Sequence, residues 1–145
     1  MSEGRKGLLS EQPAVADALF QLESELACQS ILDQAVYEIV AITALRRSRG
    51  EVSARRPNAE SAGVNASIIA AILEEDWTDP AFTAEQKVAF QFALQYDAGH
   101  LITDPVMSAA LETFGESGLI LIGLICSHYG AMARLAVGFR LDRAG

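Results

Sequence analysis

The chain has 145 residues, half of them apolar, which is enough to bury the core of one domain and argues against wholesale disorder. Its formal net charge is −8. An acidic balance of this size argues against a general nucleic-acid binder, because such proteins present a basic surface. Cys28 and Cys126 form no CxxC and no Cys/His cluster, so neither a disulfide framework nor a zinc site is indicated and a reducing cytoplasm is expected.

Helix signals begin after residues 1–9, which we expect to be a flexible N-terminal arm without the apolar run of a signal peptide. A helix-start pattern lies at residues 10–13, and apolar residues at helical spacing continue it to Leu26. A second apolar-periodic run predicts a helix over residues 31–45.

An arginine-rich stretch, RRSRGEVSARR, follows at residues 46–56 and holds five of the chain's 11 lysines and arginines. It contains Gly50 and precedes Pro57, so it is either a turn between helices or a short break leading into a third helix that ends near Gly63. Such a concentration of cations in an acidic chain fits a solvated linker, a nucleic-acid patch or one wall of a site for an anionic ligand. The acidic balance weakens the nucleic-acid alternative.

The remaining signals are also helical. Asn65 is an N-cap candidate, and Thr83 with Gln86 resembles a capping box. Helices are predicted at residues 66–73, 83–96, 103–115 and 116–137. No stretch alternates with period two between hairpin turns, so no sheet is expected. We therefore predict a single all-α domain over residues 1–145, with about six or seven helices.

The last predicted helix is apolar on nearly every side from Leu119 to Cys126, whereas a surface helix shows one apolar stripe. In a chain this small, packing against another subunit is the natural way to bury all sides, so we predict a homo-oligomer. The segment 118–133 is short for a membrane span and contains His128 and Tyr129, so a buried core helix and no membrane contact are expected.

Four stretches in order carry a resemblance to a known family: LDQAVYEIVAITALRR, ESAGVNASIIAAIL, DWTDPAFTAEQKVAFQFALQY and HLITDPVMSAALETFGESGLILIGLICSHYGAMARL. Together they resemble the carboxymuconolactone decarboxylase family, which shares its fold with the alkylhydroperoxidase D-like proteins, over roughly residues 8–142. The resemblance implies an all-helical subunit that assembles into homotrimers or hexamers. It also implies an active site at the helix that follows the turn.

The chain departs from that family at the reactive positions. Alkylhydroperoxidase D-like members carry a CxxC and a His in that helix, and the decarboxylase branch carries a Glu-Trp pair with one or two His. Here Glu51 is followed by Val52, and the family's His positions fall near Arg55 or Arg56. Thiol peroxidase chemistry needs a low-pKa thiolate and a resolving partner, so that activity is not expected.

Decarboxylation without a cofactor needs a cation that holds the substrate's anionic groups, a carbonyl that accepts the electrons as an enolate, and an acid that protonates carbon. Arginine suits the first role, because its planar guanidinium binds carboxylates with two hydrogen bonds. The candidate substrate-binding cations are Arg46, Arg49, Arg55 and Arg56, with Arg47 in the same stretch. The alternative is that these arginines are solvated or pair with nearby glutamates.

Two residues are catalytic candidates. Glu51 is a candidate general acid or base, with a surface salt bridge as the alternative. His128 lies in an apolar helix whose counterpart faces the pocket in the resembling family, with a satisfied core histidine as the alternative. The resemblance makes Tyr129 a pocket-lining residue. Glu38 lies on a largely apolar helix, which makes it a candidate supporting residue or interface ion-pair member. No His and carboxylate spacing suits a metal, so neither a metal nor a cofactor is expected.

The first functional hypothesis is a cofactor-independent lyase or isomerase for a small anionic, carboxylated substrate that reacts through an enolate-like intermediate. The second is a catalytically inactive family member that serves as an oligomeric binding or scaffold protein, because the usual Cys and His are missing. A thiol peroxidase is a distant third. The sequence does not separate decarboxylation from isomerisation, elimination or lactone hydrolysis.

Overall fold

The computed structural model describes residues 2–141, and this part of the chain contains seven helices and no strand. The helices are α1 (Glu3–Leu9), α2 (Pro13–Ala27), α3 (Gln34–Leu45), α4 (Arg49–Ser61), α5 (Ala66–Leu73), α6 (Ala84–Asp97) and α7 (Asp104–Gly138). The all-α prediction is therefore confirmed for the described residues.

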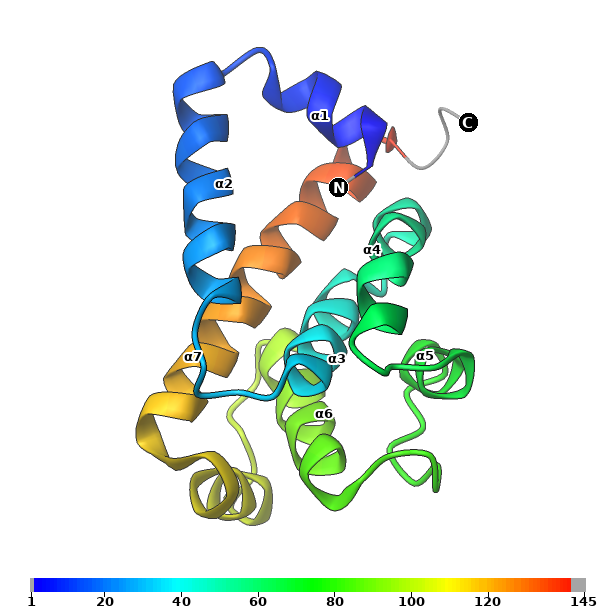
Figure 1. Ribbon diagram of the computed structural model, residues 1–145, viewed down its shortest axis with the longest axis vertical. Coiled ribbons are helices and arrows are strands. Elements are labelled where there is room, and N and C mark those ends of the chain that lie inside the picture. Colours follow the sequence, from blue (N-terminus) through cyan, green and yellow to red (C-terminus); the bar gives the residue numbers. More distant parts are fainter. Residues whose placement is uncertain (1, 142–145) are drawn as a thin grey trace.

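Helix α3 forms the centre of the core. Every residue from Ala35 to Leu45 is buried, because α4, α5, α6 and α7 surround the helix (Figure 1). The core is apolar on the sides that face α6 and α7, where Ile39, Phe90 and Ile125 are fully buried. A helix enclosed in this way is apolar around its whole circumference.

Side-chain caps set several helix starts. Asn65 Oδ1 accepts a hydrogen bond from the Ile68 N–H at 3.0 Å, and Thr83 and Gln86 form a capping box, so both predicted caps are confirmed. Ser48 caps α4, because its hydroxyl accepts from the Glu51 N–H at 3.3 Å. Of the two alternatives for the arginine-rich stretch, the break that leads into a third helix is therefore correct.

Helix α7 consists of two helical segments that meet at a kink at Gly115, which has φ 69° and ψ 175°. The sequence predicted two helices meeting at this residue, and the positive φ explains the break, since glycine adopts it without strain. Among the described residues, α7 is the one helix long and apolar enough to cross a membrane, and 61% of its most apolar window is buried inside the protein. Core helices of soluble proteins share this length and composition.

Helices α1 and α2 form an arm, the α1–α2 arm, that packs mainly along the C-terminal part of α7 (Figure 1). We expected residues 1–9 to be flexible, but the described residues there form α1. Ser2 caps this helix by accepting from the Arg5 N–H, and Arg5 and Leu9, one turn apart, are buried. Two residues of α2, Ala16 and Leu26, are buried. The arm therefore covers α7 with little apolar burial of its own.

Candidate functional site

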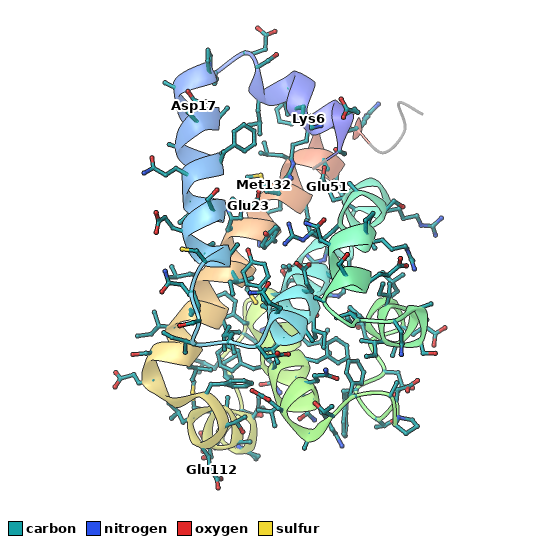
Figure 2. The ribbon with its side chains drawn as sticks, in the orientation of Figure 1. Lys6, Asp17, Glu23, Glu51, Glu112 and Met132 are labelled. Atoms are coloured by element: carbon teal, nitrogen blue, oxygen red, sulfur yellow. The ribbon has the colours of Figure 1, made fainter. Side chains whose placement is uncertain are left out.

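A cluster of polar and aromatic side chains lies between the α1–α2 arm and helices α3, α4 and α7. We call it the polar cluster: Arg5, Glu23, Tyr37, Glu38, Glu51, Arg55, His128 and Tyr129. Figure 2 shows Glu23 beside Met132 in the space between α2 and α7, with Glu51 towards α1. Five predicted site residues belong to this cluster, namely Glu38, Glu51, Arg55, His128 and Tyr129.

Arg55 and Glu38 form a bidentate ion pair between α4 and α3. Arg55 Nε and Nη2 donate to the two Glu38 carboxylate oxygens at 2.8 and 2.7 Å. Burial disfavours the charged guanidinium, but the hydrogen bonds and charge of Glu38, together with the contributions of Tyr129 and Tyr37, raise the pKa of Arg55. Because both side chains are largely buried, the charge of Arg55 is already neutralised inside the protein.

Two tyrosines meet beside this pair. The Tyr37 and Tyr129 hydroxyl oxygens lie 2.8 Å apart, and the Arg55 guanidinium carbon lies 5.1 Å from the centre of the Tyr129 ring. Burial raises the pKa of both phenols above the usual value of 10. Both hydroxyls therefore stay protonated at neutral pH and can donate a hydrogen bond to a developing oxyanion.

Glu23 and His128 bring the arm and α7 together. The His128 Nε2 atom lies 3.5 Å from Glu23 Oε1, and the His128 ring stands nearly perpendicular to Tyr129 at a centroid distance of 4.9 Å. The interaction with His128 lowers the pKa of Glu23 to about 2, against the opposing effect of burial. A permanently ionised carboxylate of this kind orients an imidazole for proton transfer.

Glu51 is buried and faces α1. Arg5 Nη2 lies 3.2 Å from Glu51 Oε2, and the Ser2 hydroxyl and N–H both donate to Glu51 Oε1. Burial lowers the pKa of Arg5, and the attraction of Glu51 opposes that shift. The alternative of a surface salt bridge for Glu51 is therefore wrong, since its side chain is 1% exposed.

A narrow crevice reaches this cluster from the arm side. It is lined by Arg5, Leu9, Leu19, Phe20, Glu23, His128 and Met132 and does not admit a water-sized sphere. The two halves of the crevice come from different parts of the chain, because the arm supplies one wall and α7 supplies the other. A substrate can enter only if these walls separate.

The other predicted arginines lie outside the polar cluster. Arg46, Arg49 and Arg56 line an open polar groove of ≈ 450 Å³ on the other face of α4. Arg46 donates to Asp97 at 2.7 Å and to Glu75 at 2.9 Å, so it ties α3 to α6. The five arginines therefore do not form one anion site, because the helical turn of α4 sends Arg55 inwards and Arg49 and Arg56 outwards.

Sequence reasoning missed three members of the cluster: Arg5, Glu23 and Tyr37. Tyr37 had a usable signal, because it stands beside Glu38 in an otherwise apolar helix and a buried hydroxyl needs a partner. Arg5 and Glu23 had no such signal in the sequence. Each stands near an exposed residue of the same charge, Lys6 and Glu25 respectively. Only the packing of the arm on α7 distinguishes them.

Among residues 2–141, no three His, Cys, Asp or Glu side chains lie close enough together to hold a metal ion. Cys126 is buried and Cys28 is exposed, and burial raises the pKa of the Cys126 thiol well above its usual range. Comparison of this chain with protein-family models, with curated proteins and with solved structures gives no match. The geometry of the polar cluster is therefore the basis for a functional proposal.

Proposed function

We propose that this protein is a cofactor-independent lyase or isomerase, resembling the carboxymuconolactone decarboxylases, that acts on a small carboxylated anion through an enolate-like intermediate. One observation carries the proposal. Residues that the resemblance selects from three helices, Glu38, Arg55, His128 and Tyr129 among them, lie together in a buried cluster with proton-exchanging and oxyanion-stabilising groups.

The proposed roles follow from the contacts. When the carbon–carbon bond to the carboxylate breaks, its electron pair moves onto the adjacent carbonyl as an enolate, and CO₂ leaves. Tyr129, which burial keeps protonated and which lies against Tyr37 and Arg55, donates to the enolate oxygen. His128, oriented by Glu23, then delivers a proton to carbon and recovers it from water. In an isomerisation the same imidazole removes and returns the proton.

We further propose the alkylhydroperoxidase D-like fold and assembly as a homotrimer or hexamer. Two α7 residues, Ile120 and Leu124, are 59% and 50% exposed and lie on one face, where they line a groove of ≈ 390 Å³ between α6 and α7. An apolar surface of this kind is typical of a subunit interface. Light scattering is expected to give an oligomer for the native chain and a smaller species for Leu124→Glu. A stable native monomer at micromolar concentration contradicts this proposal.

A second candidate is the catalytically inactive scaffold. Two observations favour it: Glu38 already neutralises Arg55, and the crevice beside His128 does not admit a water-sized sphere. In that case the polar cluster fixes the helices and reacts with nothing. The thiol peroxidase is opposed by the burial of Cys126, which keeps its thiol protonated.

The experiment that tests the enzyme proposal follows carboxymuconolactone and a set of β-keto acids by proton NMR, for loss of CO₂, migration of a double bond or ring opening. The native chain is expected to turn over at least one member, and His128→Gln is expected to be slower by about 100-fold or more, since it removes the acid–base group. Glu60→Gln, on the exposed surface of α4, is the control and is expected to match the native rate. Scaffold function predicts no turnover by any variant.

A further inference from the structure

Arg5 carries two hydrogen-bond donors that nothing in the described protein accepts. Its side chain is 4% exposed, and its Nε and Nη1 atoms are buried without a partner, while Nη2 faces Glu51 at 3.2 Å. A guanidinium has five N–H donors and does not lose its charge in proteins. Leaving a buried donor without an acceptor is unfavourable, and more so when the group is charged, so buried donors normally have a partner.

Arg5 borders the crevice that leads to the polar cluster. Arg5 shares its walls with Glu23 and His128. A carboxylate bound to Arg5 in this crevice would therefore lie against the imidazole and close to Tyr129, which packs edge-on against that ring. Binding an anion here also adds an acceptor beside a cation that has one partner, Glu51, and two unused donors.

We infer that Arg5 is the residue that binds the substrate's carboxylate, and that the α1–α2 arm carries it onto the substrate by opening and closing against α7. The inference rests on the proposed function for the nature of the reaction. It names the carboxylate-binding cation and the route of entry, neither of which follows from the arginine-rich stretch.

Two other candidate cations, Arg55 and Arg46, already have carboxylate partners. The Nε and Nη2 atoms of Arg55 both donate to Glu38, at 2.8 and 2.7 Å. Arg46 donates to Asp97, Glu75 and the Thr43 carbonyl, and it lines a different groove. Among the arginines that belong to the polar cluster, Arg5 is the one with buried donors to spare.

The attachment of the arm suits an opening motion. Its buried side chains are few, with Leu9 on α1 and Ala16 and Leu26 on α2. Leu19 and Ala27 are partly buried against the core, and the polar ties to the body run from Ser2 and Arg5 to Glu51 and from Glu23 to His128. Segments with little buried apolar surface open at a lower free energy than the core. Opening is also required, because the closed crevice admits no water-sized sphere.

The test uses the full chain with acetate and succinate as probes and chloride at equal ionic strength as the reference anion. Calorimetry gives the Kd, and hydrogen exchange reports protection of residues 3–27. Succinate or acetate is expected to bind and to slow exchange in the arm. Arg5→Gln is expected to weaken binding by about tenfold or more, which is the worth of one charge-assisted hydrogen bond. Lys6→Gln, exposed on the same helix, is the matched control and should bind as the native chain does.

Each outcome decides the inference. It is overturned if neither carboxylate protects the arm of the native chain, if Arg5→Gln binds with native affinity, or if protection maps only to the groove at Arg49 and Arg56. Where Arg5→Gln does not fold, Arg5→Lys keeps the charge but loses the planar donor array, and native affinity in that variant overturns the inference. Carboxylate binding that depends on Arg5, without turnover of any substrate, supports the inference and rejects the proposed function. Native turnover in Arg5→Gln supports the proposed function and overturns the inference about Arg5.

Discussion

Helix α7 has two unlike neighbours. On one side α3 and α6 meet it through fully buried apolar residues such as Ile39, Phe90 and Ile125. On the other side the α1–α2 arm meets it through an ion pair, an arginine with two unpartnered nitrogens and a few apolar side chains. The first contact stabilises the fold by burying apolar surface. The second brings titratable side chains together. The fold therefore rests on the α3–α6–α7 core, and the proposed chemistry is assigned to the boundary with the arm.

The largest effect on stability is expected in the polar cluster, at the ion pair between Glu38 and Arg55. Glu38→Gln removes the charge that neutralises Arg55 and leaves a buried cation, so the free energy of unfolding should fall by about 3–5 kcal/mol. Urea unfolding measures the loss. Glu60→Gln, whose carboxylate lies 4.0 Å from Arg56 on the surface, should change it by less than about 0.5 kcal/mol. Equal midpoints for the two variants would show that the buried pair contributes nothing.

A pair of truncations compares the two neighbours of α7 directly. Ile125→Ala in the core should cost about 2–5 kcal/mol, because it leaves a cavity in a fully buried position. Leu19→Ala in the arm, where the side chain is half-buried, should cost about 1 kcal/mol. Chemical denaturation of both variants gives the two values. A larger loss for Leu19→Ala would mean that the arm is part of the folding core.

Acid should loosen the arm before the core. The pKa of Glu23 is lowered from 4.5 to about 2 in the folded chain, so its stabilising contribution is complete above 4.5 and is lost as the pH falls from 4.5 towards 2. Hydrogen-exchange protection of α2 should fall across that window while α3 stays protected. Glu25→Gln, exposed on the same helix, should keep this acid dependence, and Glu23→Gln should abolish it. If exchange protection of α2 depended on pH in the same way in both variants, Glu23 would not be the group responsible.

The smallest effect is expected at the open groove. Arg49 is exposed and lies outside the polar cluster, so Arg49→Gln should change the free energy of unfolding by less than about 0.5 kcal/mol. The Kd for succinate, measured by calorimetry, should also be unchanged. A tenfold weaker affinity of Arg49→Gln for succinate would show that the anion binds in the groove and not in the crevice.

Helix class and most boundaries could be predicted from the sequence, because caps and apolar periodicity are local signals. Asn65 and the Thr83–Gln86 capping box act within a few residues, and the structure confirms them. The arginine-rich stretch was harder, since Gly50 suggested a turn. Ser48 caps a helix there, and the helical period then places Glu51 and Arg55 on one face and Arg49 on the other.

The polar cluster could be predicted only in part. Glu38, His128 and Tyr129 stand out as polar groups in apolar helices, which is a signal that one helix carries by itself. Arg5 and Glu23 sit among exposed charges in the arm, and their burial depends on how that arm packs on α7. Such long-range packing leaves no trace in the local pattern of charges. For the same reason the sequence could not show that Glu38 neutralises Arg55.

The central claim is that the polar cluster reacts and does not merely hold helices together. It is tested most directly by comparing Tyr129→Phe with Tyr96→Phe on the carboxymuconolactone and β-keto acid panel. Tyr129 lies in the cluster, whereas Tyr96 is 39% exposed and its hydroxyl meets Ser127 at 2.9 Å. The account predicts a loss of turnover of about 100-fold or more for Tyr129→Phe and none for Tyr96→Phe, with both variants folded. Native turnover in Tyr129→Phe, or no turnover by the native chain, would contradict it.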